Sequence, residues 1–184
     1  MATFNYTAGA GDCWGSQLGA FFATGTFVAF GDSASGGGAN SNAWIPFVVN
    51  LTQGRVLVSA TLKVIASENK SGTTCKVRVG CEDADNPSTP ISYSDLLART
   101  MTTAYVDNNN VAAWTAGTEY SFDVTAAVQE VLDRAGWAIG NTLAVILADN
   151  GSFNDITRNF ASSENTSYAE AILTVVTRYG GQVI

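Results

Sequence analysis

The segment YSFDVTAAVQEVLDRAGWAIGNTLAVILADN, residues 120–150, changes its hydrophobic period twice and thereby predicts the fold. Residues 120–124 alternate between apolar and polar side chains, which is typical of a half-buried strand. Residues 126–135 repeat apolar side chains at spacings of three and four, which predicts a short amphipathic helix capped by Thr125. The nearly all-apolar run at residues 142–148 predicts a strand buried on both faces or central in a sandwich. We therefore expect a strand, a helix that covers the core, and a second strand.

Further strands are expected wherever alternating or apolar runs lie between turn residues. They are residues 26–30, 43–49, 55–67, 75–81, 102–106, 156–160 and 169–179. In the longest, the even-numbered residues from Val56 to Ala66 form one fully apolar face. About eight strands with one short helix at about residues 126–135 predict an all-β fold, an antiparallel jelly-roll β-sandwich.

Three local details are also predicted. Pro46 lacks an amide hydrogen, which places its strand at an edge or a bulge. Residues 107–110 are rich in Asp and Asn, which end strands and form turns, so the strand before them stops there. One helical turn is expected at residues 94–99, capped by Ser92 or Ser94.

The chain divides into an N-terminal segment, residues 1–40, a sandwich domain, residues 41–180, and a short C-terminal tail, residues 181–184. Two Gly-rich stretches in the first segment flank a short apolar run, in which only residues 26–30 have the pattern of a strand. The segment carries a large aromatic load, namely Phe4, Tyr6, Trp14, Phe21 and Phe22. It is either a meandering segment that finishes in an edge strand or an arm that leaves the domain to hold a neighbouring subunit.

The charge balance restricts the partners. Of 184 residues, 9 are basic and 16 acidic, which gives a net charge of −7. So few cationic groups cannot neutralise many phosphates and attract anionic lipid weakly, so neither nucleic acid nor a membrane is expected as a partner. The N-terminal residues lack the basic and apolar regions of a signal peptide, so we expect synthesis without one, or its earlier removal.

The residue inventory argues against catalysis. The chain has no histidine, which removes the commonest general base and most transition-metal sites. Cys75 and Cys81 lie six residues apart in one predicted strand, about 20 Å from each other and too far for a disulfide. We expect buried thiols in a reducing compartment, with a disulfide between Cys13 and one of the other two as the alternative.

Carboxylates cluster at predicted strand ends. They are Glu82, Asp83, Asp85, Asp107 and Asp149. Such groups can form a glycosidase-type pair or a calcium site, but Asp and Asn also simply make good turns. We therefore predict no catalytic, cofactor or metal site, and no enzyme activity.

Aromatic side chains are the candidates for an interaction surface. Trp44 and Trp137 flank predicted strands and are expected in the core. Trp14 and Trp114 lie in loop-like sequence and are expected to be more exposed, where they suit a sugar or a protein partner equally well. The full set of interaction candidates is Phe4, Tyr6, Trp14, Phe21, Phe22 and Trp114.

Several segments together resemble a known family. They are residues 44–47 (WIPF), 58–62 (VSATL), Trp114, the FDVT junction at 122–125, Trp137 and the 171–175 strand (AILTV). In this order they are similar to the DNRLRE-type jelly-roll domains, which are related to carbohydrate-binding modules, over residues 12–179. The DNRLRE peptide itself is absent. The resemblance implies a sandwich and, by extension, a sugar-binding or adhesin role.

A likeness of type leads to a different function. An acidic single sandwich domain with a Gly-rich N-terminal arm looks like the decoration or cement proteins of tailed-phage capsids. This likeness implies a virion protein made in the host cytoplasm, whose partner is the major capsid protein or another virion protein. It also implies a homo-oligomer, with a trimer favoured and residues 1–40 wrapped across subunits.

Overall fold

The computed structural model describes residues 1–34, 38–72, 75–153 and 155–178, so the predicted tail at 181–184 lies outside the described residues. The strands are β1 (Ala2–Thr7), β2 (Cys13–Ser16), β3 (Phe21–Phe22), β4 (Phe27–Asp32), β5 (Asn40–Val48), β6 (Leu57–Ile65), β7 (Cys75–Cys81), β8 (Val106–Val111), β9 (Glu119–Asp123), β10 (Thr142–Asp149), β11 (Thr157–Ala161) and β12 (Ile172–Thr177). The helices are α1 (Tyr93–Leu97) and α2 (Thr125–Leu132).

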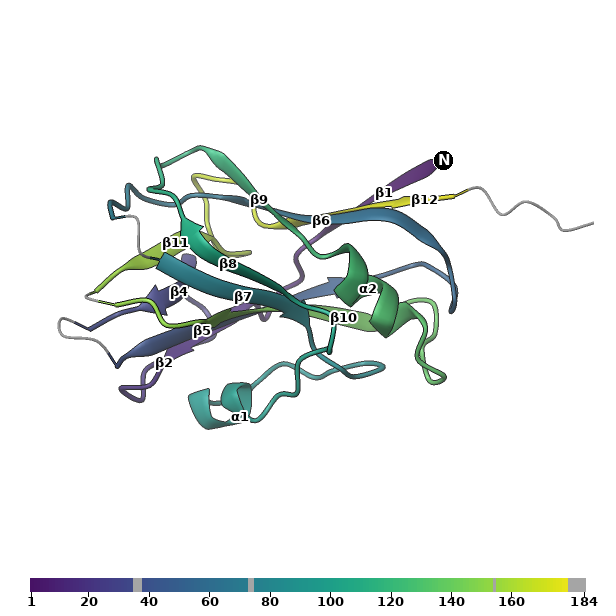
Figure 1. Ribbon diagram of the computed structural model, residues 1–184, viewed down its shortest axis with the longest axis horizontal. Helices are drawn as coiled ribbons and strands as arrows, with labels where there is room; N and C mark the ends of the chain where they lie inside the picture. The colour runs from purple at the N-terminus through teal and green to yellow at the C-terminus, as the bar shows by residue number, and fades with distance from the viewer. Residues whose placement is uncertain (35–37, 73–74, 154, 179–184) are drawn as a thin grey trace, which may run out of the picture.

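The strands form two antiparallel sheets that face each other (Figure 1). The smaller sheet has the order β1-β12-β6-β9, and the larger follows the path β11-β4-β5-β10-β7-β8, with β2 and β3 beside β5. β1 pairs with β12, β5 with β10, β6 with β9 and β7 with β8, so the chain forms nested antiparallel pairs that alternate between the sheets. This nesting over two sheets is the jelly-roll topology, and the predicted fold class is confirmed.

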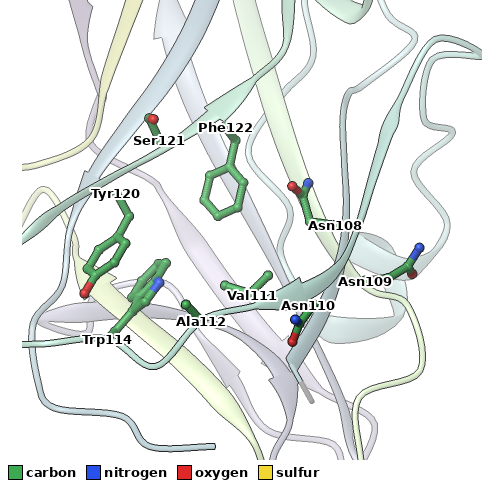
Figure 2. Close-up of a pocket in the computed structure, with 9 residues that line it drawn as sticks. All are labelled: Asn108, Asn109, Asn110, Val111, Ala112, Trp114, Tyr120, Ser121 and Phe122. Atoms are coloured by element: carbon green, nitrogen blue, oxygen red, sulfur yellow. The ribbon is translucent and has the colours of Figure 1, made fainter. Parts of the chain in front are cut away.

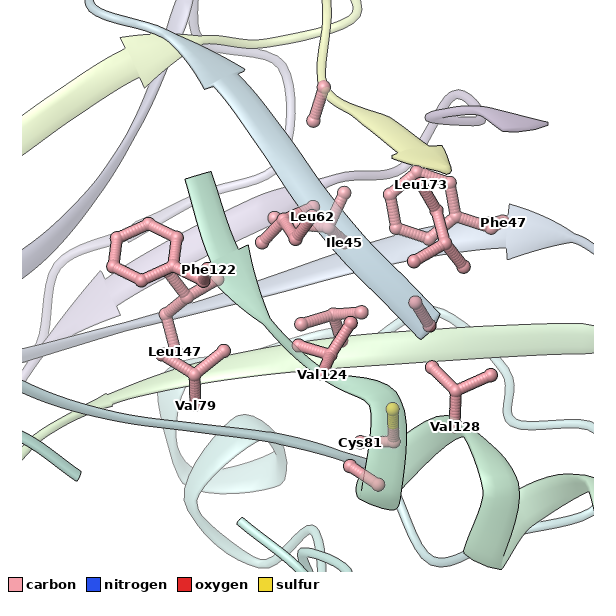
Figure 3. Close-up of a cluster of buried hydrophobic side chains, with 14 of the residues drawn as sticks. Ile45, Phe47, Leu62, Val79, Cys81, Phe122, Val124, Val128, Leu147 and Leu173 are labelled. Carbon is pink, nitrogen blue, oxygen red and sulfur yellow. The ribbon is translucent and has the colours of Figure 1, made fainter. Parts of the chain in front are cut away.

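One apolar cluster fills the space between the sheets, and α2 lies against it (Figure 3). Phe47 and Leu147 from the larger sheet and Leu62 and Leu173 from the smaller are completely buried. Val128 of α2 reaches the same cluster. Residues 120–150 therefore contribute to the core from both sides. β9 and β10 lie in opposite sheets, and α2 between them packs against both sheets.

The larger sheet also buries part of its outer face. There Trp44 and Cys13 pack with Tyr93 and Leu96 of α1 in a second cluster. Trp44 donates its indole hydrogen to Glu82 Oε2 at 2.7 Å, which satisfies the polar atom of a fully buried ring. The prediction that Trp44 lies in the core is confirmed.

The N-terminal segment contains more strand than its sequence pattern predicts. Besides β4, residues 1–40 form β1, β2 and β3, so the expectation of a single strand at residues 26–30 is wrong. β1 pairs along its whole length with β12 of the same chain, and β2 pairs with β5. These strands have two to six residues, too few for a clear period, and they are defined by their partners.

The predicted apolar face of residues 55–67 is broken at its start. The pairing of β6 with β12 shifts register between Ser59 and Leu57, so that Val58 is the extra residue of a bulge. Val56 and Val58 are therefore 55% and 41% exposed, whereas Leu57 is buried. Alternation resumes as predicted from Ala60 onward.

The strand predicted at residues 102–106 is displaced. β8 instead includes Asp107 and residues 108–110, because β7 offers them a backbone partner. Pairing with a neighbour therefore overrides the turn preference of Asp and Asn. β8 is the outermost strand of the larger sheet, where polar side chains can face water on both sides.

The edge position predicted for Pro46 holds only locally. Its strand, β5, lies inside the larger sheet between β10 and the β2 and β4 strands, so an edge strand is the wrong description. The β2 pairing stops at Trp44, however, and beyond it the Pro46 oxygen accepts the Gly9 amide hydrogen at 2.9 Å. The proline therefore lies where no neighbouring strand requires its missing hydrogen.

The helix starts are set by side chains. α2 is shorter than the predicted 126–135, and Thr125 is not its N-cap: Val124 holds that position without a side-chain hydrogen bond. Asp123 instead accepts the Thr125 amide at 2.9 Å, and the Thr125 hydroxyl accepts the Ala60 amide of β6 at 2.9 Å. The predicted turn near residue 94 is the short helix α1, and Ser92 caps it through Asp95 N at 3.1 Å.

Candidate functional site

Three of the six interaction candidates lie on one hairpin, β2–β3. Trp14 and Phe22 stack with ring centroids 4.5 Å apart, and Phe27 at the start of β4 lies 5.5 Å from Trp14. We call Trp14, Phe22 and Phe27 the aromatic patch. Phe22 is 43% exposed, while Phe21 points to the opposite side and packs against the Trp44 cluster. The structure thus brings Trp14 and Phe22 together and separates Phe21 from them.

Phe4 and Tyr6 lie on β1, at the edge of the smaller sheet. Both are half-buried, and their rings are nearly parallel with centroids 6.5 Å apart. They pack against the margin of the main core. The residues that alternate with them, Thr3, Asn5 and Thr7, are exposed. The strand therefore has one apolar and one polar face.

Trp114 is not the exposed loop residue that the sequence suggests, because only 3% of it is accessible. It stacks on Tyr120 at 4.5 Å and meets Phe30 edge-on at 5.7 Å. Two backbone hydrogen bonds with Lys70, at 2.9 and 2.8 Å, hold its segment in place. Trp114 therefore belongs to the main core, as does Trp137, whose predicted place in the core is confirmed.

A cleft of about 370 Å³ opens between β8 and β9, beside this stack (Figure 2). One wall is formed by Asn108, Asn109 and Asn110 of β8, and Trp114, Tyr120 and Phe122 lie across from it. The Asn109 amide points away from these rings, so Asn108 and Asn110 supply the polar groups of the wall. Amide groups that both donate and accept hydrogen bonds thus face an apolar wall, an arrangement suited to a small polar ligand. The sequence pattern does not predict this cleft because it places residues 108–110 in a loop.

The clustered carboxylates do not converge on one site. Asp83 and Asp85 both pair with Arg134, and Asp107 forms a two-pronged pair with Arg78 at 2.7 and 2.9 Å. A further acid of the set, Glu82, binds Arg99 and Trp44, while Asp149 accepts the amides of Gly151 and Ser152 in a turn. Asp83 and Asp85 share Arg134, and each of the other three carboxylates has separate partners.

Asp12 is a buried acid that the sequence pattern does not single out. It is 2% exposed, and its carboxylate accepts hydrogen bonds from the Ser163 amide at 3.0 Å and hydroxyl at 2.8 Å. Burial raises the pKa of Asp12 to about 6, against the opposing effect of Ser163, and the nearby Glu164 adds to the rise. The contact fastens the β1–β2 connection to the segment after β11.

Arg158 is the largest buried charged side chain among the residues that the structure describes. Its guanidinium donates to the backbone oxygens of residues 71, 72, 111, 112 and 157, and no part of the residue is exposed. Burial lowers its pKa, although carbonyl oxygens surround the charge. The sequence pattern contains no signal for this, because all five residues of β11 are buried and the acceptors of the Arg158 hydrogens come from distant segments. Arg158 ties β11 to β8 and to the loop before β7.

All three cysteines are free and buried. Burial raises the pKa of Cys13 to about 12 and that of Cys75 to about 11, and it raises the pKa of Cys81 as well. The groups therefore stay protonated near neutral pH and act as small apolar side chains. The alternative disulfide of Cys13 is absent.

In the described residues, no three Cys, Asp or Glu side chains are placed to hold a metal ion. None of the described helices is long and apolar enough to cross a membrane. No protein-family model matches the chain, and no curated protein matches it in sequence. The DNRLRE-type and phage-protein resemblances therefore remain predictions.

Proposed function

We propose that this chain is a non-enzymatic structural protein of a virus particle, a capsid decoration or cement protein that binds the capsid lattice as an oligomer. It is made in the host cytoplasm, resides in the virion and has the major capsid protein or another virion protein as its partner. The aromatic patch of Trp14, Phe22 and Phe27 is the observation that carries this proposal.

The patch has the features of a protein-binding surface. The Trp14 ring is stacked on Phe22, so both rings are ordered before a partner arrives. Phe22 remains 43% exposed and gains from burial against another surface. Rigid aromatic side chains carry much of the affinity of protein interfaces, because little conformational entropy is lost when they dock.

The polar groups support the same proposal. The acids considered for catalysis are held in ion pairs and turns, and the thiols are buried and protonated. Because these groups are paired or buried, they are not available for chemistry. This supports a role in which the surface binds another protein by shape complementarity.

The test is binding to capsids from the virus whose genome carries this gene. Wild-type protein is expected to sediment with capsids stripped of accessory proteins, and Phe22→Ala is expected to weaken this binding about tenfold, the usual cost of a moderate interface residue. Phe153→Ala is the matched control, because Phe153 is 55% exposed on the β10–β11 connection and is not part of the patch. Equal binding by both variants, or none by wild type, would contradict the proposal.

The cleft between β8 and β9 favours a second candidate, a carbohydrate-binding or adhesin module. Sugars combine hydroxyl groups with apolar ring faces, which match the asparagine wall and the aromatic wall. On a glycan array, Asn108→Ala should lose binding that Asn165→Ala retains, because the Asn108 side chain points towards the aromatic side of the cleft. Asn108 is the better probe than Trp114, since truncating a buried tryptophan disturbs the core.

A further inference from the structure

β1 offers an unused backbone edge. Within the described part of the chain, β12 is the sole strand that pairs with β1. Ala8 donates its amide hydrogen to Ala171 at 2.8 Å, one step beyond that ladder and in the same register. Hydrogen-bonded positions alternate along an antiparallel pair, so the even-numbered residues of β1 face β12. The N–H and C=O groups of Thr3, Asn5 and Thr7 therefore point outward.

The other sheet edges carry features that block pairing, and β3, which among the described strands pairs only with β2, has just two residues. β9 begins with Glu119 and ends with Asp123. β8 carries Asp107 and an irregular register against β7. β11 is connected to the end of β6 by a bridge between Phe160 and Ala66. β1, with the sequence ATFNYT, has no charge, no proline and no bulge, the usual means of protecting an edge.

We propose that β1 pairs antiparallel with β1 of a second copy of this chain, across a two-fold axis at Asn5. This inference rests on the oligomeric part of the proposed function and names its contact. Thr3 lies opposite the partner's Thr7, and about six backbone hydrogen bonds form. The smaller sheets of the two copies, each four-stranded, become one continuous sheet.

The side chains fit this register. Phe4 lies directly opposite the partner's Tyr6, in the closer type of antiparallel pair, where aromatic side chains stabilise each other. The half-buried pair of rings on each copy is then covered by the pair from the other. Two copies that each carry a net charge of −7 repel one another, and an uncharged strand is where they can approach. The contact is two-fold and closes on itself, so it makes a dimer in place of the trimer expected by analogy.

Sedimentation of Asn5→Pro against wild type tests the pairing. The Asn5 N–H points away from β12, so proline removes no hydrogen bond within the chain. Wild type is expected to be a dimer at micromolar concentration. Asn5→Pro should raise the dimer dissociation constant about 100-fold, from two lost hydrogen bonds and the clash of two rings. Asn5→Thr keeps the N–H and should dimerise as wild type does.

Cross-linking supplies an independent readout of the register. Asn5→Cys should form a disulfide-linked dimer under mild oxidation, because the two copies place this position face to face. Ser121→Cys, exposed on the β9 edge, is the control and should remain a dimer without a disulfide link. A monomeric wild type, a trimer unaffected by Asn5→Pro, or equal cross-linking of both cysteine variants would overturn the inference. Capsid binding is scored separately, so a dimer that fails to bind capsids contradicts only the virion role.

Discussion

Residues 120–150 and residues 1–40 make similar contributions to the fold but differ in how far their sequence predicts them. Each region supplies strands to both sheets: β9 and β10 from the first, β1 and β2–β4 from the second. The first has an eight-residue helix and an eight-residue apolar strand, long enough for a period to be visible. The second has strands of two to six residues between glycines. The length of an element therefore decides whether its hydrophobic period can be recognised in the sequence. Shorter strands are determined by the strands with which they pair.

The largest loss of stability is expected from Gly31→Ala, a change in the N-terminal region. Gly31 has φ of 111°, and a Cβ there would overlap the backbone oxygen of Ile156 in the neighbouring β11 segment. We expect a loss of about 5 kcal/mol in the free energy of unfolding, measured with urea, because two strands must separate. Gly19→Ala is the control, with φ of 88° but no atom within 4 Å, and should cost about 1 kcal/mol. Equal costs would mean that close packing at Gly31 does not matter.

Leu132→Ala tests residues 120–150, the region whose hydrophobic pattern predicted its structure. Leu132 is completely buried at the end of α2, so its truncation leaves a cavity in the main core. The expected loss is about 3 to 4 kcal/mol in the same urea experiment. Ala126→Ser, on the exposed side of α2, should change stability by less than about 0.5 kcal/mol. A small effect at Leu132 would show that the helix is dispensable to the core.

Asp12→Asn tests how a buried carboxyl group in the N-terminal region affects the pH dependence of folding stability. Because burial raises the pKa of Asp12 to about 6, the folded state binds a proton more tightly than the unfolded state, and wild-type stability falls as pH rises from about 4 to 6. A shift of about two pKa units amounts to about 3 kcal/mol. Asp12→Asn should therefore gain about this much relative to wild type between pH 3.5 and 7. Asp155→Asn, at an exposed position, should show no such gain.

Asp123→Ala has the smallest expected effect and refines the account of the α2 start. Asp123 accepts the Thr125 amide and hydroxyl, at 2.9 and 2.6 Å, so its loss should cost about 1 kcal/mol. Asp133→Ala at the opposite end is the control. A negative charge at a helix C-terminus is unfavourable, which offsets the hydrogen bond that Asp133 accepts from Gln129 at 2.9 Å, so that change should be close to neutral. Similar losses at both ends would indicate that the hydrogen bonds from Thr125 to Asp123 do not stabilise the start of α2.

The candidate sites were less predictable than the fold. Phe22 was identified from its residue type, but its stacking on Trp14 depends on how β2 and β3 pair. Trp114 was expected to be exposed because loop-like sequence surrounds it, whereas a bridge to Lys70 folds it into the core. The asparagines of the cleft have turn-forming side chains, and only the neighbouring β7 strand makes them extended.

By itself, the sequence determined the all-β class, the two strands and helix of residues 120–150, and most of the apolar residues that lie in the core, because these follow from spacing within a few neighbouring side chains. Only the tertiary structure decided the bulge at Val58, the burial of Arg158, the cleft and the open edge of β1. Each of these depends on pairing between segments far apart in the chain. Backbone hydrogen bonds and buried charges are satisfied wherever partners meet, and no local pattern contains that information.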